Sequence, residues 1–535
     1  MTTLKSKADS LLRQIAAITL LVSAFVLAAM VAALPWLAPD KPGIAFLLCI
    51  IAGFALIGRR LWRPRPWAFW LVVLAAVLLI PAVALSRSFR RIDMLAIVFH
   101  KEFGMQGATL AGLGTPILQA VLCALAMVLI FLGLSSFGRW RGWHFAVAAL
   151  AVLAINPVVQ YLAVSQLSAT VPSDLSRHLA SPRPRPADPQ AVLPDVIMVY
   201  MESTDRQFAD SAVWGDVYEP LDDLARRGMS FTRIGQIAGT GWSLAGLVAT
   251  NCAVPILPRG PLYRTNFEDI EEFMPEMTCL GDILADKGYR SAFVVGGDLG
   301  FGGIDTFFRT HRIEDITGLR ELEAVYPADE IAKSLIGWVL DDQMVFDFAT
   351  GKLAELQAQP QPYALIVETI GPHGDNGFLS RRCTKDGQAA FSRDIALVVR
   401  CTIEDTLAFV THAEAEQARL RPGKPLAVVV MSDHLSAHPR PPAVAPEYDG
   451  YNTLILLGAE AEPGRVVTKP GSMVDVLPTM LDWLGWAEDP VAIGLGRSLL
   501  GTGKTIVESH SIEALDSMLT TDVELANKVW AAAVP

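Results

Sequence analysis

Five long apolar runs near the start of the sequence limit what this chain of 535 residues can fold into. Most of them approach the roughly 20 apolar residues that a helix needs to cross about 30 Å of hydrocarbon. A cleaved signal peptide would not be followed by further runs of this kind. Residues 1–165 are therefore predicted to form an α-helical membrane domain with about five spans, at residues 15–36, 43–57, 67–85, 115–134 and 144–162.

Basic residues predict how these spans are oriented. With five spans, three basic clusters fall on the side that the positive-inside rule makes cytoplasmic: Lys5, Lys7 and Arg13; Arg59, Arg60, Arg63 and Arg65; and Arg139 and Arg141. Everything after residue 162 then lies outside. Segment 87–101 is also basic and has apolar residues at helical spacing. It is read either as an amphipathic helix on the outer lipid surface or as a helix packed against neighbouring spans.

Charge is divided unevenly between the two parts of the chain. Residues 1–165 contain 14 Lys and Arg against 4 Asp and Glu, a net charge of +10, whereas the whole chain carries −11. The remainder therefore carries −21. An acidic globular part argues against nucleic acid as a partner, because phosphate backbones attract basic surfaces.

The chain beyond the spans reads as a linker followed by an α/β domain. Residues 166–193 include the proline-rich stretch 181–189, which is typical of a stiff, extended linker. Short apolar runs then alternate with helical stretches, which indicates a mainly parallel central sheet. Residues 194–505 form this predicted domain, residues 506–535 form a helical tail, and the strands are expected at 196–201, 292–295, 364–367, 426–431 and 454–457.

Ionisable residues directly follow two of these strands. Ligands gather at the carboxyl ends of parallel strands, and Glu202 follows the first strand while Asp433 and His434 follow the fourth. Carboxylate oxygens and an imidazole nitrogen suit a divalent cation. Alternatively, Glu202 is a carboxylate at a helix N-terminus and Asp433-His434 is an ordinary loop. The three residues together favour a metal site.

A hydroxyl nucleophile is expected in the glycine-rich stretch 239–246, Gly-Thr-Gly-Trp-Ser-Leu-Ala-Gly. Apolar residues at helical spacing follow it, so Ser243 lies at a predicted helix N-terminus, where free N–H groups and the helix dipole stabilise anions. A metal there would lower the pKa of the hydroxyl. Ser243 as a simple helix cap and Thr240 as a competing hydroxyl remain alternatives.

Four cysteines lie in the exported part: Cys252, Cys279, Cys383 and Cys401. An even number in an oxidising compartment suggests two disulfides, most simply Cys252–Cys279 and Cys383–Cys401. Metal binding by these cysteines is the rival interpretation, although the sequence has no Cys-x-x-Cys pair.

These residues together resemble the alkaline phosphatase/sulfatase superfamily. Within it, the chain is most similar to the lipoteichoic acid synthase-like branch, and in particular to the phosphoglycerol transferases that decorate osmoregulated periplasmic glucans. The resemblance covers most of residues 195–501, and both cysteine pairs fit it. The matching stretches are 202–206, 239–246, 279–284, 377–383, 432–435 and 494–498.

The resemblance implies roles for individual residues. Glu202, Asp433, His434 and the Ser243 oxygen would bind one divalent metal ion, Mn, Mg or Zn. Ser243 would be the nucleophile at a position usually held by Thr. His373 and His438 are candidates for substrate binding, with a surface role as the alternative for each. The His–Trp–Arg cluster that holds lipid phosphate in lipoteichoic acid synthases has no counterpart in the corresponding stretch 295–303.

The resemblance also implies a function and a location. The expected enzyme lies in a bacterial inner membrane with its sulfatase-like catalytic domain in the periplasm. It would move phosphoglycerol from phosphatidylglycerol to a periplasmic glucan and release diacylglycerol. A phosphoethanolamine transferase and a non-enzymatic protein with a degenerate domain are the alternatives. A formylglycine sulfatase is disfavoured, because the proline after Cys252 comes one position too late for that motif.

Overall fold

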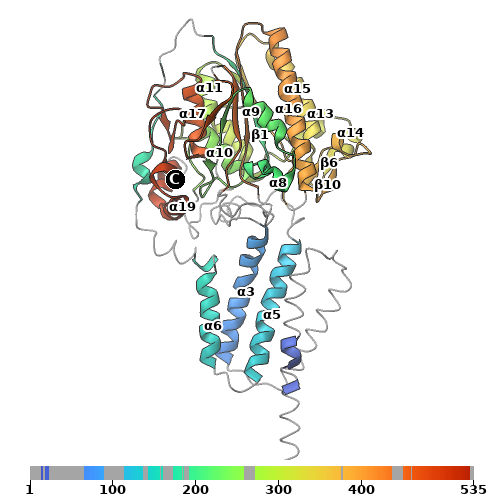
Figure 1. The fold of residues 1–535 in the computed structure, drawn as a ribbon, viewed down its shortest axis with the longest axis vertical. Coiled ribbons are helices and arrows are strands. Elements are labelled where there is room, and N and C mark those ends of the chain that lie inside the picture. Colours follow the sequence, from blue (N-terminus) through green and yellow to red (C-terminus); the bar gives the residue numbers. More distant parts are fainter. Residues whose placement is uncertain are drawn as a thin grey trace, which may run out of the picture. The chain divides into compact units, whose positions relative to one another are not determined.

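The described residues of the chain form two compact units. The first contains the apolar helices, and the second contains the described residues from 173 onward; Figure 1 shows the elements of each. The computed structural model describes residues 14–15, 18–22, 66–88, 114–136, 142–156, 158–160, 173–183, 185, 192–257, 271–374, 377–436, 450–459 and 461–530.

Three apolar helices dominate the described part of the first unit: α3 (Pro66–Ser88), α5 (Gly114–Ser136) and α6 (Gly142–Ile155). Helices α3 and α5 are long and apolar enough to cross a membrane, over Trp67–Ala84 and Ile117–Leu134. Helix α6 is apolar but has only 14 residues. The third and fourth predicted spans therefore coincide with helices of sufficient length.

The predicted count of five spans is not confirmed, because several of the segments concerned lie outside the described residues. These are the run at 43–57, most of the run at 15–36, the end of the run at 144–162 and nearly all of the basic segment at 87–101. Multiple spans and the exported position of the second unit stay predictions.

The second unit is built around an eight-stranded sheet with the order β13-β2-β12-β11-β1-β8-β4-β5. All neighbours in the sheet pair in parallel except β12, which is antiparallel to both β11 and β2. The mainly parallel sheet predicted from the sequence is thus confirmed. All five expected strands are present, as β1 (Asp195–Met201), β4 (Arg290–Val295), β8 (Tyr363–Glu368), β11 (Leu426–Ser432) and β12 (Leu454–Gly458).

Three short strands that the sequence did not reveal complete the sheet. They are β2 (Met229–Phe231), β5 (Asp315–Thr317) and β13 (Arg465–Val467). Each has only three residues, which is too short for an apolar pattern to be recognised.

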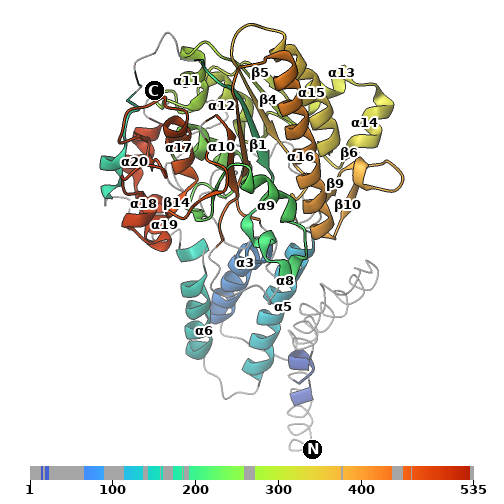
Figure 2. The same ribbon diagram turned by 45° about the horizontal axis from the view of Figure 1, so that its top comes forward.

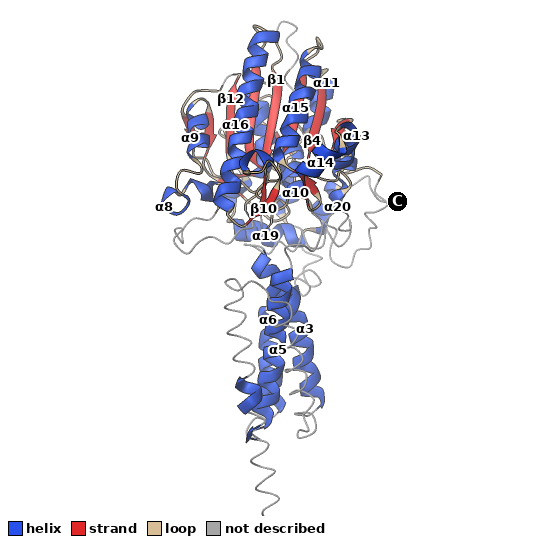
Figure 3. Cartoon of the chain, turned by 90° about the vertical axis from the view of Figure 1, so that its right-hand side faces the viewer, coloured by secondary structure: helices blue, strands red, loops and turns tan. Residues whose placement is uncertain are grey.

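Helices cover both faces of the sheet, as parallel strands require. Figures 1 and 2 show α9 (Glu219–Arg226), α15 (Asp342–Gln357) and α16 (Ile395–Leu420) on one side of β1. On the other side lie α10 (Ser243–Cys252), α11 (Leu280–Asp286) and α17 (Val476–Trp483). The strands, red in Figure 3, run lengthwise alongside α15 and α16.

Strand β1 explains why both faces must be covered, since all seven of its residues are buried. Side chains alternate between the faces of a strand. Ile197, Val199 and Met201 accordingly join the core cluster under α9, α15 and α16. The intervening residues, including Tyr200, face the side of α10: the Tyr200 hydroxyl is 2.7 Å from the Thr250 hydroxyl of that helix.

Both expected disulfides are present. Cys252, the last residue of α10, is bonded to Cys279, which directly precedes α11. Cys383, which follows strand β9 (Gly377–Leu379), is bonded to Cys401 of α16. Because each sulfur is used in a disulfide, these cysteines offer no thiolate to a metal in this state.

The chain segments on either side of the predicted domain pack into the same compact unit as the sheet. The tail forms α18 (Ile506–Ser509), α19 (Ile512–Thr521) and α20 (Val523–Val529). After α20, the Trp530 indole N–H donates to the Leu257 carbonyl at 2.9 Å. In the predicted linker, the Arg185 amide donates to the Trp486 carbonyl at 2.9 Å; residues 184 and 186–191 lie outside the described residues.

A buried charge cluster fixes the end of β1 that lies away from the predicted site. The Asp195 carboxylate, fully buried, is 2.8 Å from the Arg421 guanidinium and 3.0 Å from the Lys424 ammonium. It also accepts hydrogen bonds from the Gln417 side chain at 2.8 Å and the Tyr363 amide at 3.2 Å. One carboxylate therefore ties together β1, β8 and the end of α16.

Removal of this carboxylate should destabilise the second unit strongly. Asp195→Ala leaves two basic side chains without their buried partner, which typically costs about 3–5 kcal/mol. We expect a loss of that order in the free energy of unfolding, measured by tryptophan fluorescence in urea on the detergent-solubilised chain. Arg419→Ala on the same helix removes an exposed pair with Glu416 and should leave the unfolding midpoint unchanged. Equal midpoints for Asp195→Ala and the native chain would contradict this view of the cluster.

Candidate metal centre and active site

Two strand ends bring the predicted metal ligands together. Strands β1 and β11 pair in parallel with Met201 opposite Ser432, so the residues that follow them emerge at the same edge of the sheet. Glu202, Asp433 and His434 each place a ligand atom within 4.8 Å of the others. The His434 Nε2 atom is 3.4 Å from Glu202 Oε1 and 3.2 Å from Asp433 Oδ2.

Backbone and side-chain hydrogen bonds hold this cluster in place. Asp433 Oδ1 accepts from the amides of Ser203 at 2.8 Å and His434 at 2.7 Å. The Ser203 hydroxyl donates to Glu202 Oε1 at 2.6 Å. Ser203 has a positive φ of 50°, a strained conformation for a non-glycine residue, and this turn gives its amide and hydroxyl access to both carboxylates.

The imidazole of His434 is oriented to present one nitrogen to the carboxylates. Its Nδ1 atom is 2.9 Å from the Leu435 carbonyl, which can only accept, so Nδ1 carries the proton. Nε2 faces Glu202 and Asp433. This orientation is the one found in metal-binding histidines, where a carbonyl on one nitrogen leaves the other as ligand.

The electrostatics of the cluster call for a positive charge. Burial, with the adjacent Glu202 carboxylate, raises the pKa of Asp433 to about 7. Asp433 Oδ2 is buried and accepts no hydrogen bond from the described residues. Two buried carboxylates with oxygens within 4.8 Å of each other repel unless a proton or cation lies between them. The donor set of two carboxylates and one imidazole therefore fits a divalent cation.

Ser243 is the hydroxyl that the fold brings to this cluster. It is the first residue of α10, and its Oγ donates to Glu202 Oε2 at 3.2 Å. The N-cap position of this helix is held by Trp242, so Ser243 is not the helix cap. A Cβ atom on Gly246 would lie 2.0 Å from the Asp433 carbonyl, so glycine is required for α10 to approach β11 this closely.

The competing hydroxyl, Thr240, is placed differently. Its side chain is fully buried and donates to the Ile237 carbonyl at 2.8 Å. It contributes to the turn before α10 and makes no described contact with Glu202, Asp433 or His434. Of the two candidates, Ser243 alone has a described hydrogen bond to the carboxylate cluster.

His373 lies near the cluster on the loop after β8. Although its ring is only partly buried, the atoms packed around it, and then the nearby His434, lower its pKa to about 4, so the ring is neutral at ordinary pH. It stacks on Phe378, with ring centres 6.0 Å apart, and meets the edge of Trp338 at 5.4 Å. His438 lies outside the described residues, and its predicted role stays a prediction.

Glu368 is a candidate that the sequence reasoning missed. It is the last residue of β8, is buried, and neither carboxylate oxygen has a hydrogen-bond partner among the described residues. Burial, followed by the charges of Asp433 and Glu202, raises its pKa well above the ordinary value. A signal was present, since this Glu directly follows an apolar strand as Glu202 does. The next residue, Thr369, accepts a hydrogen bond from the Glu202 amide at 3.0 Å.

Comparison with known proteins agrees with this architecture. Residues 194–486 match the sulfatase family, and the chain belongs to that family. Phosphoglycerol transferase I of Escherichia fergusonii is 29% identical over 414 residues, which cover 74% of this chain and 52% of that protein. The protein of the same name from Citrobacter koseri is 28% identical over 488 residues, covering 86% and 61%.

The chain thus spans about half the length of the curated relatives that it matches, such as the E. fergusonii protein. Among solved structures, lipoteichoic acid synthase LtaP from Listeria monocytogenes is similar to this chain with 14% identity and a TM-score of 0.45. The similarity covers 69% of this chain and 97% of that chain.

The cluster should bind one divalent cation in the purified chain. After removal of metal with EDTA, titration calorimetry with Mn²⁺ should show a single site. Glu202→Gln and Asp433→Asn each remove a charged ligand, so the affinity should fall by more than the roughly 10- to 100-fold that loss of an outer partner costs. Asp298→Asn, a carboxylate paired with Arg320 outside the cluster, serves as control and should bind as the native chain does. Unchanged binding in a Glu202→Gln/Asp433→Asn double variant would refute the site.

Proposed function

We propose that this chain is a phosphotransferase that moves a phosphoglycerol group from phosphatidylglycerol to a hydroxyl of a periplasmic glucan. The observation that carries the proposal is the Ser243 hydroxyl, which is hydrogen-bonded to Glu202 beside Asp433 and His434. The names of the curated relatives support phosphoglycerol as the transferred group. The apolar helices α3 and α5 support a lipid as donor, because such a chain would remain at the membrane where the donor resides.

The chain's own residues supply most of the parts of such a reaction. The first amides of α10 have no acceptor within the helix and can hold a phosphoryl oxygen. Glu202, Asp433, His434 and the Ser243 oxygen would hold one divalent ion (Mn, Mg or Zn), which when bound supplies positive charge that favours the ionised hydroxyl and polarises the phosphoryl group. Glu202 and Asp433, both buried, would repel each other less with that charge between them.

The proposed transfer has two steps. In the first, a bond forms between Ser243 Oγ and phosphorus, the bond from phosphorus to the diacylglycerol oxygen breaks, and the serine proton passes to Glu202, its hydrogen-bond partner. Diacylglycerol leaves with a proton from the surroundings. In the second, a sugar hydroxyl forms a bond to phosphorus, the bond to Ser243 breaks, and the serine oxygen takes its proton back from Glu202. His373, on the loop after β8, is the residue proposed to accept the proton of the incoming hydroxyl.

The donor, the nucleophile and the covalent step can be tested together. The full chain is placed in lipid vesicles with Mn²⁺ and phosphatidylglycerol labelled in its head-group glycerol. It should release unlabelled diacylglycerol and retain label on the protein. Ser243→Ala should lower the rate by about 10³-fold or more, since a nucleophile acts as a unit with its activating groups. Ser243→Thr keeps the hydroxyl and should keep measurable transfer. Thr240→Val, which removes the competing hydroxyl, should still trap label.

Other outcomes would redirect or end the proposal. Turnover of phosphatidylethanolamine in place of phosphatidylglycerol would keep the mechanism and change the transferred group to phosphoethanolamine. Label trapped on Ser243→Ala would refute the nucleophile. If a chain that binds Mn²⁺ turned over neither lipid, a non-enzymatic domain that retains its metal site would be favoured.

A further inference from the structure

We propose that Asp342 is a positioning residue that fixes the loop carrying His373 and thereby sets where this histidine meets the substrate. The proposal rests on the function proposed above, because it assigns His373 a part in that reaction. Asp342 is the first residue of α15 and comes from a different part of the sequence than any residue of the metal cluster.

The contact consists of hydrogen bonds from the loop backbone to one buried carboxylate oxygen. Asp342 Oδ1 accepts from the Ile370 amide at 2.7 Å and from the Gly371 amide at 3.2 Å. These amides lie three and two residues before His373, whose own amide donates to the Ile370 carbonyl at 3.1 Å. The other oxygen, Oδ2, accepts from the Thr402 hydroxyl of α16 at 2.7 Å.

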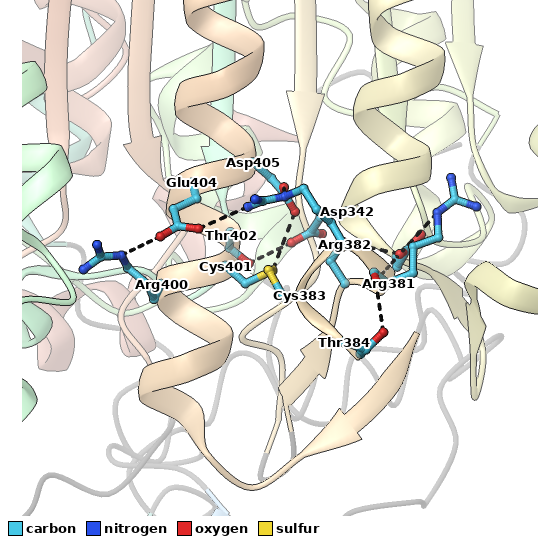
Figure 4. The surroundings of a disulfide bond; sticks show 12 residues. Asp342, Arg381, Arg382, Cys383, Thr384, Arg400, Cys401, Thr402, Glu404 and Asp405 are labelled. Atoms are coloured by element: carbon cyan, nitrogen blue, oxygen red, sulfur yellow. Dashed lines mark hydrogen bonds and ion pairs between the residues drawn. A yellow bond between two sulfur atoms is a disulfide. The ribbon is translucent and has the colours of Figure 1, made fainter. Parts of the chain in front are cut away.

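Asp342 is itself held from two sides. Figure 4 shows the Thr402 hydroxyl hydrogen-bonded to Asp342, next to the Cys383–Cys401 disulfide. This disulfide joins the segment after strand β9 to helix α16. The preceding residue, Asp341, caps α15 and accepts from the Arg381 amide at 2.7 Å. Two adjacent carboxylates at the start of α15 therefore hold two segments: Asp342 holds the loop at 370–371, and Asp341 holds the segment at Arg381.

The loop has a glycine, Gly371, at the point where its backbone comes closest to the Asp342 carboxylate. A Cβ atom there would lie 2.2 Å from the Thr402 hydroxyl and 2.7 Å from Asp342 Oδ2. Glycine therefore permits the backbone to approach closely enough to donate both amides. The other end of the loop is fixed by the hydrogen bond between Thr369 and the Glu202 amide. The segment is thus tied to the metal cluster at one end and to Asp342 in its middle.

The loop can be held whether or not Asp342 is ionised. Burial raises the pKa of Asp342 to about 7, and the carboxyls of Asp405 and Asp341 also favour the neutral form. In that form Oδ1 still accepts from the two amides, while a proton on Oδ2 can donate to Thr402. Asparagine presents the same carbonyl oxygen and an N–H group in these places, so it should replace Asp342, whereas alanine should not.

Amide exchange on the full chain with bound Mn²⁺ tests the loop directly and needs no transfer activity. In Asp342→Ala, exchange of the Ile370 and Gly371 amides should become at least about tenfold faster, since both lose their acceptor. Asp342→Asn should keep them protected. Glu355→Ala is the matched control, because it removes an exposed carboxylate from the same helix and should leave exchange at these two amides unchanged. Unchanged exchange in Asp342→Ala would overturn the proposal.

Transfer kinetics test the link to His373. Asp342→Ala should lower kcat by about 10- to 100-fold with little change in KM, as expected for a misplaced reacting group, and Asp342→Asn should restore it. In a His373→Ala background, Asp342→Ala should have no further effect. Additive losses in the double variant, or a His373→Ala chain as active as the native one, would show that Asp342 does not act through His373.

A second variant, Gly371→Ala, tests the same contact in case Asp342→Ala does not fold. Gly371→Ala leaves Asp342 intact and pushes the loop away from it, so it should reproduce both the faster exchange and the lower kcat. If Gly371→Ala folds and shows neither effect, the proposal is wrong regardless of the behaviour of Asp342→Ala. If the chain has no transfer activity at all, the proposed function fails while the exchange measurement still decides whether Asp342 orders the loop.

Discussion

Mutual repulsion among buried carboxylates is the constraint on which the arrangement of this domain depends. Parallel pairing of β1 with β11 and β8 brings Glu202, Asp433 and Glu368 to one edge of the sheet. Each is almost fully buried, and Glu202 adds to the raised pKa of both Asp433 and Glu368. Such a cluster is stable only with protons or a cation, so the fold that creates it also creates a requirement for positive charge.

Two contacts, one near each end, fix the position of helix α10. At its start, Gly246 lets the helix lie against the Asp433 backbone, which sets the distance of Ser243 from Glu202. At its end, Cys252 is bonded to Cys279. A helix fixed in this way holds the Ser243 backbone in place beside Glu202, as the proposed two-step reaction would require.

The sequence predicted the parts of the site that follow long apolar strands, because periodicity and strand ends are local signals. Glu202, Asp433 and His434 were found in this way. Ser243 was predicted from a glycine-rich stretch before a helix, and the two disulfides from the even number of cysteines beyond the apolar runs. The reversed direction of β12 was not foreseen, since alternation of side chains does not reveal strand direction. Glu368 was overlooked beside the apolar run at 364–367, although it ends that strand. The contact of Asp342 with the loop at 370–371 joins distant segments and has no local signature.

The placement of Asp342 suggests why the domain has two independent supports for its active-site loops. The backbone amide of Glu202 holds the Thr369 hydroxyl, so this support comes from a residue of the predicted metal cluster itself. Asp342 lies on a separate helix and is held by Thr402 and by the segment that the Cys383–Cys401 disulfide anchors. A loop held from this second side can keep His373 in position while the charge of the cluster changes. In the proposed reaction, geometry at the acceptor side would thereby be separated from electrostatics at Ser243.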